Sequence, residues 1–84
     1  MGFIVSVKTG NTWKQVDECR TALAARKSVY KACKEYWTQA EIRKPMIAKN
    51  DLIGRAYYEN GKVLYQPMSS HMKFPLRADG TIKW

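Results

Sequence analysis

Four basic residues recur at a spacing that would place them along one edge of a helix: Arg20, Lys27, Lys31 and Lys34. At ~100° of rotation per residue, their side chains fall within roughly 60° of arc. A row of cationic side chains can pair with the phosphates of a nucleic acid. Lysine stems also cover the margins of hydrophobic cores, so a solvated helix flank is the other interpretation.

Arg55 and Tyr57 form a second group with chemical potential. The Asn60-Gly61 pair predicts a hairpin over residues 52–66, because both residues suit a tight turn that needs positive φ. Cross-strand neighbours share a face, so this register turns Arg55 and Tyr57 away from the core. An exposed tyrosine beside an arginine can stack on a base, and a tyrosine is equally at home on a half-exposed strand. The face turned toward the core then holds Ala56, Tyr58, Val63 and Tyr65.

Three further basic residues, Lys73, Arg77 and Lys83, lie in a predicted hairpin over residues 72–84. A three-residue loop that ends at Gly80 gives this hairpin a consistent apolar face. That register pairs Leu76 with Ile82 and Phe74 with Trp84. The three basic residues then share the opposite face and make a second basic patch.

No constellation of residues points to an enzyme, a metal site or a cofactor. Cys19 and Cys33 are too few for a zinc site, and on one helix they would lie roughly 21 Å apart, too far for a disulfide. His71 is the only histidine, and no serine and acid are spaced to join it in a triad. We therefore expect a non-catalytic protein without metal or cofactor. Free thiols indicate a reducing, cytoplasmic location.

The basic row depends on a long amphipathic helix, predicted over residues 13–37. Thr12 and Gln15 fit a capping box at its start. Apolar residues at three- and four-residue steps predict its buried face: Val16, Cys19, Leu23, Tyr30, Cys33, Trp37 and Ala40.

The remaining elements are shorter. Residues 3–8 alternate as a strand, with Phe3, Val5 and Val7 on one face. A short second helix is predicted over residues 39–43, ended by Pro45, and residues 46–51 form a connection. The expected fold is a single small basic α+β domain over residues 1–84, with a mainly antiparallel sheet and the order β-α-(α)-β-β-β-β.

Composition narrows the partner. The chain has 84 residues, 15 Lys+Arg and 7 Asp+Glu, and a formal net charge of +8. This excess favours acidic partners, either a nucleic acid (DNA or RNA) or an acidic protein surface. No apolar run is long enough for a membrane span, so a membrane partner is not expected. Exposed strand edges near Ile53 and Leu64 predict a surface for a homodimer.

The leading hypothesis is a non-catalytic nucleic-acid-binding protein of bacterial or phage type. The helix row and the hairpin patch would contact phosphates, and Arg55 and Tyr57 would add base or groove contacts. The alternative is a phage-type inhibitor, such as an anti-CRISPR or another counter-defence protein, that occupies a host protein surface in the host cytoplasm. Three Trp and five Tyr residues would supply its contact surface.

A third hypothesis comes from a resemblance. In its small size, its basic charge and its order of strand, helices and sheet, the chain resembles the RelE/ParE toxin family. Arg55, Tyr57 and Tyr58 loosely match that family's arginine-rich strand followed by a tyrosine-rich one. The resemblance implies a metal-free ribonuclease, in which His71 and Arg77 would be the residues to test.

Overall fold

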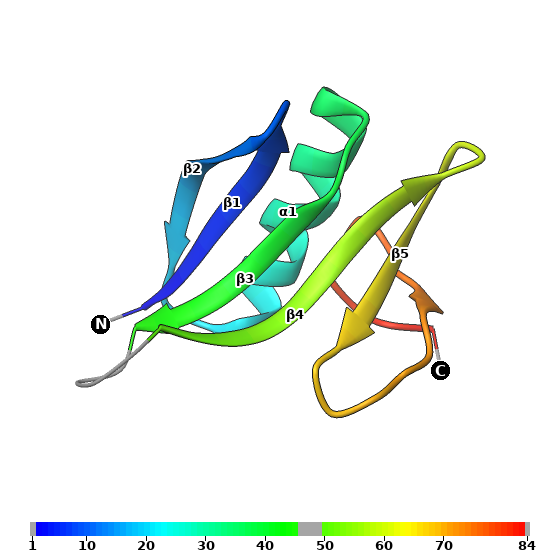
Figure 1. The fold of residues 1–84 in the computed structure, drawn as a ribbon. Coiled ribbons are helices and arrows are strands. Elements are labelled where there is room, and N and C mark those ends of the chain that lie inside the picture. The colour runs from blue at the N-terminus through cyan, green and yellow to red at the C-terminus, as the bar shows by residue number, and fades with distance from the viewer. Residues whose placement is uncertain (1, 46–49, 84) are drawn as a thin grey trace.

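The computed structural model describes residues 2–45 and 50–83 and shows one helix packed on a six-stranded antiparallel sheet (Figure 1). The elements are β1 (Phe3–Thr9), β2 (Thr12–Cys19), α1 (Ala22–Tyr36), β3 (Ala40–Pro45), β4 (Asn50–Glu59), β5 (Lys62–Pro67) and β6 (Phe74–Pro75). The strands lie in the order β2-β1-β3-β4-β5-β6. The expected α+β class is confirmed, but the element order is β-β-α-β-β-β-β, so the predicted β-α start is wrong.

The stretch predicted as the first turns of the helix is the strand β2. It forms a hairpin with β1, in which Thr9 pairs with Thr12 across the two-residue turn Gly10-Asn11. Gly10 has φ 63°, and a glycine with positive φ at the first position is what a type II′ hairpin turn requires. Thr12 therefore begins a strand and does not cap a helix.

A β-bulge explains why β2 was misread. Val5 pairs with Asp17 and Ser6 pairs with Gln15, so Val16 is an extra residue on the β2 side. A bulge shifts the alternation of inward and outward residues along a strand. The apolar residues of β2 therefore do not recur at every second position, which is the period that identifies a strand. Taken together with the apolar residues of the following helix, they recur at three- and four-residue steps, as they would in one longer helix.

The helix α1 is shorter than predicted and begins after a different threonine. The Thr21 hydroxyl oxygen accepts from the Ala24 N–H at 3.1 Å, which satisfies one of the free amides at the helix start. The buried face of α1 consists of Ala25, Val29, Ala32 and Cys33. Leu23 and Trp37, both predicted to face the core, are exposed.

The predicted second helix over residues 39–43 is also wrong, because this segment lies in β3. Ala40 and Ile42 are buried, and they alternate with Glu41 and Arg43 on the opposite side. That two-residue period is a strand pattern and not a helical one. The predicted connection over residues 46–51 lies mostly outside the described residues, and residues 50 and 51 belong to β4.

The two sides of the sheet differ. The helix covers one side, and in Figure 1 the sheet lies in front of the helix. The core between them is made of Val5, Val7, Cys19, Ala25, Val29, Ala32, Cys33, Ala40, Ile42, Ala56, Val63, Tyr65 and Leu76. We call the other side the open sheet face; residues paired with Glu41 and Arg43 across the strands point to it.

The hairpin of β4 and β5 agrees with the sequence prediction. Ala56 pairs with Tyr65 and Tyr58 with Val63. Asn60 and Gly61 both have positive φ, at 52° and 76°. The inward set is confirmed, because Ala56, Val63 and Tyr65 are buried and Tyr58 packs against the core.

The C-terminal segment keeps only part of its predicted hairpin. Leu76 pairs with Ile82 as expected. Phe74, however, pairs with Tyr65 and adds β6 to the edge of the main sheet. Its predicted partner, Trp84, lies outside the described residues. In the part of the chain that the structure describes, no helix has the length and apolarity that a membrane crossing requires.

Candidate nucleic-acid interface

Three of the four basic residues predicted for the helix edge lie together on α1. Lys27, Lys31 and Lys34 are exposed along one side of the helix, and we call them the lysine row. Because α1 rises ~1.5 Å per residue, the row extends about 10 Å along its axis. Arg20 is exposed but lies in the bend before the helix, beside Gly2 and Glu18, so it is not part of the row.

A groove runs along the lysine row, between α1 and the C-terminal turn, and we call it the helix groove. Tyr30 and the three lysines line it from the helix, and Ala78 lines it from the turn. Asp17, Ser28 and Glu35 complete its lining. The groove therefore combines an aromatic ring with more cationic than anionic groups.

The second wall of the helix groove is held in place by Gly80. The Arg26 guanidinium donates from Nε to the Gly80 carbonyl at 2.7 Å and so ties the turn to the helix. Gly80 has φ 87°, and a Cβ added to it would lie 2.7 Å from the Leu23 carbonyl oxygen and 2.8 Å from Cγ of Lys27. Only a glycine allows this backbone conformation and this close approach together.

The ammonium groups of the lysine row are available to a ligand. Among the described residues, the structure records no ion pair for Lys27, Lys31 or Lys34. Lys34 Nζ lies 5.7 Å from the centroid of the Tyr30 ring, within reach of a cation–π interaction. Lys31 contributes to holding down the pKa of Asp17 through its charge.

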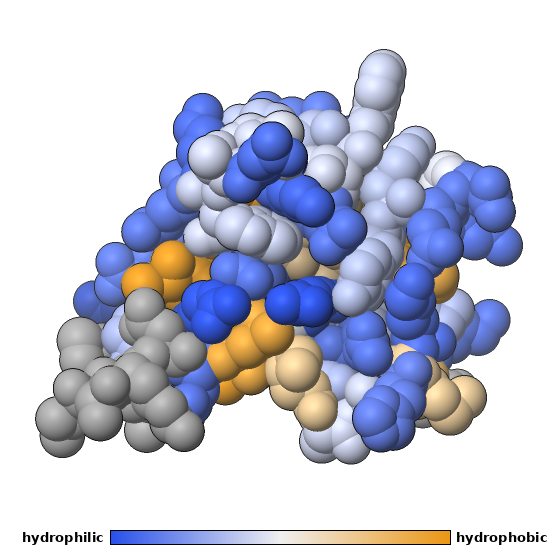
Figure 2. Space-filling view, in the orientation of Figure 1, coloured by the Kyte–Doolittle hydropathy of each residue, from blue (hydrophilic) through white to orange (hydrophobic). Residues whose placement is uncertain are grey.

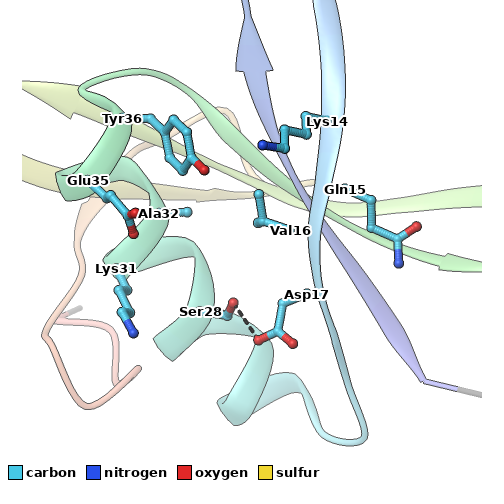
Figure 3. Close-up of a pocket in the computed structure, with 9 residues that line it drawn as sticks. All are labelled: Lys14, Gln15, Val16, Asp17, Ser28, Lys31, Ala32, Glu35 and Tyr36. Carbon is cyan, nitrogen blue, oxygen red and sulfur yellow. Dashed lines mark hydrogen bonds between the residues drawn. The ribbon is translucent and has the colours of Figure 1, made fainter.

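A hollow lies on the other flank of α1, between the helix and β2 (Figure 3). Lys14 points across it toward Tyr36, with Nζ 5.9 Å from the ring centroid. Gln15 points away from the hollow, as its pairing with Ser6 on the open sheet face requires. Lys31, Asp17 and Glu35 also line the hollow, so it combines two basic with two acidic side chains.

Asp17 lines this hollow and links β2 to α1 through a hydrogen bond. Its carboxylate accepts from the Ser28 hydroxyl at 2.8 Å and from the Glu18 N–H at 2.8 Å. These hydrogen bonds hold the pKa of Asp17 below its usual value, the Ser28 bond having the largest effect. The carboxylate is thus ionised and occupied within the protein at neutral pH.

On the open sheet face, the carboxylates bind the neighbouring cations. Glu41 is only 4% exposed, and its carboxylate accepts from Arg43 Nε at 2.7 Å. Ile4 and Leu52 pair with Arg43 from the two adjacent strands, one on each side. Figure 2, which views this face, shows apolar surface beside strongly hydrophilic surface. The arrangement is a partly buried ion pair bordered by apolar side chains.

Tyr57 lies on the open sheet face as predicted, but its ring is covered. Lys73 Nζ lies 4.2 Å from the ring centroid and also pairs with Glu59 at 3.2 Å. The Tyr57 hydroxyl donates to Gln66 Oε1 at 3.1 Å. Because Lys73 occupies the ring face, Tyr57 does not present an open stacking platform on this side.

Arg55 lies next to Tyr57 and pairs across the sheet with Glu41 and Gln66. Its Nε is buried and has no hydrogen-bond partner. Glu41 is its direct cross-strand neighbour, but among the described residues no ion pair is recorded between the two side chains. Glu41 is bound instead by Arg43.

The second predicted basic patch is divided. Lys73 belongs to the open sheet face, whereas Arg77 precedes Ala78, which lines the helix groove on the opposite side. Arg77 donates from Nη1 to the Thr81 hydroxyl at 3.2 Å. Lys83 is exposed and follows Ile82, which packs against the core. The recorded contacts thus place Lys73 beside Tyr57 and Glu59, and Arg77 beside Thr81.

Comparisons with protein-family models, curated proteins and solved structures find no match to this chain.

The cysteines and His71 lie apart from these surfaces. Cys19 ends β2 and Cys33 lies on α1; both thiols are free and buried. Burial raises the pKa of Cys33 to about 12 and also raises the pKa of Cys19. His71 is exposed in the loop between β5 and β6. Among the described residues, no three His, Cys, Asp or Glu side chains gather as metal ligands.

Sequence reasoning missed Tyr30, Ala78 and Gly80 as parts of the site. Tyr30 was assigned to the core, and it packs against the core while also lining the helix groove. Gly80 carried a usable signal, since its loop position was predicted to need positive φ. Its docking partner, Arg26, is 54 positions away in the sequence, and no local pattern links the two.

Proposed function

We propose that this chain is a non-catalytic nucleic-acid-binding protein whose lysine row contacts phosphates. One observation carries the proposal: three lysines without ion pairs among the described residues follow one another along the helix groove. Lysine ammonium groups are compact donors that bind phosphate oxygens well. The net charge of +8 adds a general attraction to polyanions.

The pairing of charges favours the helix side over the open sheet face. Lys73 and Arg43 are engaged by Glu59 and Glu41, so a phosphate would have to compete with a carboxylate already in place. Asp17 and Glu35 also line the helix groove, but no ion pair with Lys27, Lys31 or Lys34 is recorded among the described residues. Phosphate binding there releases counterions from the nucleic acid, which gives an affinity that falls steeply with salt.

A charge-matched pair of variants tests the proposal. The helix variant carries Lys27→Gln, Lys31→Gln and Lys34→Gln, and the sheet variant carries Lys8→Gln, Lys62→Gln and Lys73→Gln. Both lose the same charge. Fluorescence anisotropy with labelled DNA and RNA, over a series of salt concentrations, measures affinity and its salt dependence.

We expect the helix variant to bind about tenfold or more weakly, with a salt slope lower by about 2 to 3, since each phosphate contact contributes about 1. The sheet variant should keep most of its affinity. Equal losses in both variants would mean that total charge, and not the lysine row, governs binding. If the wild type binds no nucleic acid at low salt, the proposal is wrong; if it cleaves the RNA probe, the non-catalytic assignment is wrong.

A further inference from the structure

Trp37, at the end of α1, has a conformation and an exposure that the fold does not require. It caps the helix in the left-handed region, with φ 54° and ψ 42°, and its N–H donates to the Cys33 carbonyl at 2.8 Å. Its side chain is 77% exposed, more than any other large hydrophobic side chain among the described residues.

Both properties are unfavourable for a tryptophan. The left-handed conformation strains any residue with a Cβ, which is why glycine or asparagine usually occupies this capping position. The capping hydrogen bond uses only the backbone, so glycine would make it equally well. An exposed indole gains almost nothing from packing. Residues held in a strained backbone conformation cluster at sites that contact ligands.

Trp37 lies at the end of the lysine row. It follows Lys34, the last lysine of the row, by three residues, and its backbone N–H is bonded to Cys33, the neighbour of Lys34. Tyr36 is also exposed, but its ring faces Lys14 across the hollow and not the lysine row. Trp37 is therefore the exposed aromatic residue at the C-terminal end of the helix that carries the row.

The helix end favours a base over a phosphate beside Trp37. The last carbonyls of a helix give its C-terminus a partial negative charge, which repels phosphate. The uncharged face of a base meets no such repulsion and stacks well on an indole. Phosphates therefore belong on the lysine row, and a base belongs on Trp37.

We propose that Trp37 stacks on an unpaired base, so that the ligand of the lysine row is single-stranded nucleic acid. This inference rests on the proposed function and specifies its ligand class. In a duplex the base faces are stacked on each other and closed to a protein ring, whereas a single strand leaves them open.

The test compares Trp37→Gly with the wild type, using a labelled single strand and the duplex of the same sequence. Stacking contributes about 1–3 kcal/mol per base, so we expect Trp37→Gly to weaken single-strand binding at least about fivefold. Duplex binding and the salt slope should stay unchanged. The melting temperature should rise by about 4 °C, because glycine relieves the left-handed strain.

Trp13→Ala is the matched control. Trp13 is 41% exposed, but it lies on β2, pairs with Lys8 of β1 and points to the open sheet face. We expect this variant to bind the single strand as the wild type does. A loss as large as that of Trp37→Gly would remove the specific role of Trp37.

The outcomes separate this inference from the proposed function. If the duplex binds as tightly as the single strand, or Trp37→Gly binds like the wild type, the single-strand inference is overturned while the lysine row stands. If neither probe binds at low salt, both fail. In that case a nuclease-resistant protein partner lost in Trp37→Gly would assign the exposed ring to protein recognition.

Discussion

The lysine row and the open sheet face carry similar residues in opposite electrostatic situations. On the open sheet face, Arg43 and Lys73 are each held by a carboxylate, and Arg55 lies beside the buried Glu41. On α1, the lysines extend from the helix without an ion pair among the described residues. The comparison shows that the fold neutralises Arg43 and Lys73 from within and leaves Lys27, Lys31 and Lys34 without a recorded ion pair among the described residues.

The largest effect on stability is expected from Glu41→Gln. This change removes a buried carboxylate and deprives Arg43 of its ion-pair partner Glu41. We expect a loss of about 2 kcal/mol in the free energy of unfolding, below the usual cost for a fully buried pair because Arg43 is partly exposed. Urea denaturation measures this loss.

Glu59→Gln is the control for that prediction. Its partner Lys73 and its own carboxylate are both exposed, so the loss should stay below about 1 kcal/mol. Nucleic-acid affinity should be unaffected by Glu41→Gln within about twofold. If the two glutamates contribute equally to stability, burial does not distinguish the ion pairs of this face.

Gly80→Ala should have an intermediate effect and connects stability with the helix groove. The added methyl group would press on the Leu23 carbonyl and on Lys27, besides forcing alanine into positive φ. We expect a loss of about 1–2 kcal/mol, together with weaker binding, because Lys27 must move. Denaturation and anisotropy on the same preparation measure the two effects.

Gly61→Ala separates strain from contact. Gly61 also has positive φ, at 76°, but nothing lies within 4 Å of a Cβ placed there. This variant should lose stability through strain alone and bind normally. If Gly80→Ala also binds nucleic acid with normal affinity, the turn at Ala78 does not contribute to binding in the helix groove.

The smallest effect on stability is expected at Asp17, whose carboxylate binds Ser28 and so links β2 to α1. Its pKa is lowered in the folded protein, so its ionised form stabilises the fold above the unfolded pKa of about 3.9. That contribution is lost as the pH falls through the lower folded pKa. Wild type should therefore melt slightly above Asp17→Asn at pH 7, and this difference in melting temperature should disappear as the pH falls through the folded pKa of Asp17.

Ser28→Ala provides the control, since Ser28 makes the hydrogen bond that lowers this pKa most. Ser28→Ala should lower the free energy of unfolding at neutral pH about as much as Asp17→Asn does, by under about 1 kcal/mol. A gap between wild type and Asp17→Asn that is the same at every pH would show that the carboxylate charge contributes nothing.

The sequence predicted the local features and failed where a feature depended on distant partners. Asn60-Gly61 fixed the register of its hairpin, and the loop before Thr81 fixed the Leu76–Ile82 pair. Gly10-Asn11 carried the same kind of turn signal, but the bulge at Val16 removed the alternation that would have supported it. The predicted helix over residues 13–37 therefore includes most of the residues that form the strand β2 in the structure.

The site followed the same rule. The lysine row was predicted because its spacing belongs to a true helix, and Arg20 was misplaced because that helix begins later. Trp37 was assigned to the core from its spacing alone. A left-handed cap ends the helix at that residue and turns the ring outward, and spacing contains no information on backbone conformation at a helix end.

The sheet order also has a consequence for folding kinetics. β2 pairs with β1, and β3, β4 and β5 pair in succession, so most of the sheet can form from neighbouring segments. The pairing of β1 with β3 joins these two halves, and it encloses β2 and the whole of α1 in one chain loop. Closing that loop has an entropic cost that the docked helix must offset. The joining of β1, β3 and α1 is thus the expected rate-limiting step, and substitutions at Val5, Ile42 or Val29 should slow folding more than substitutions in the β4–β5 turn.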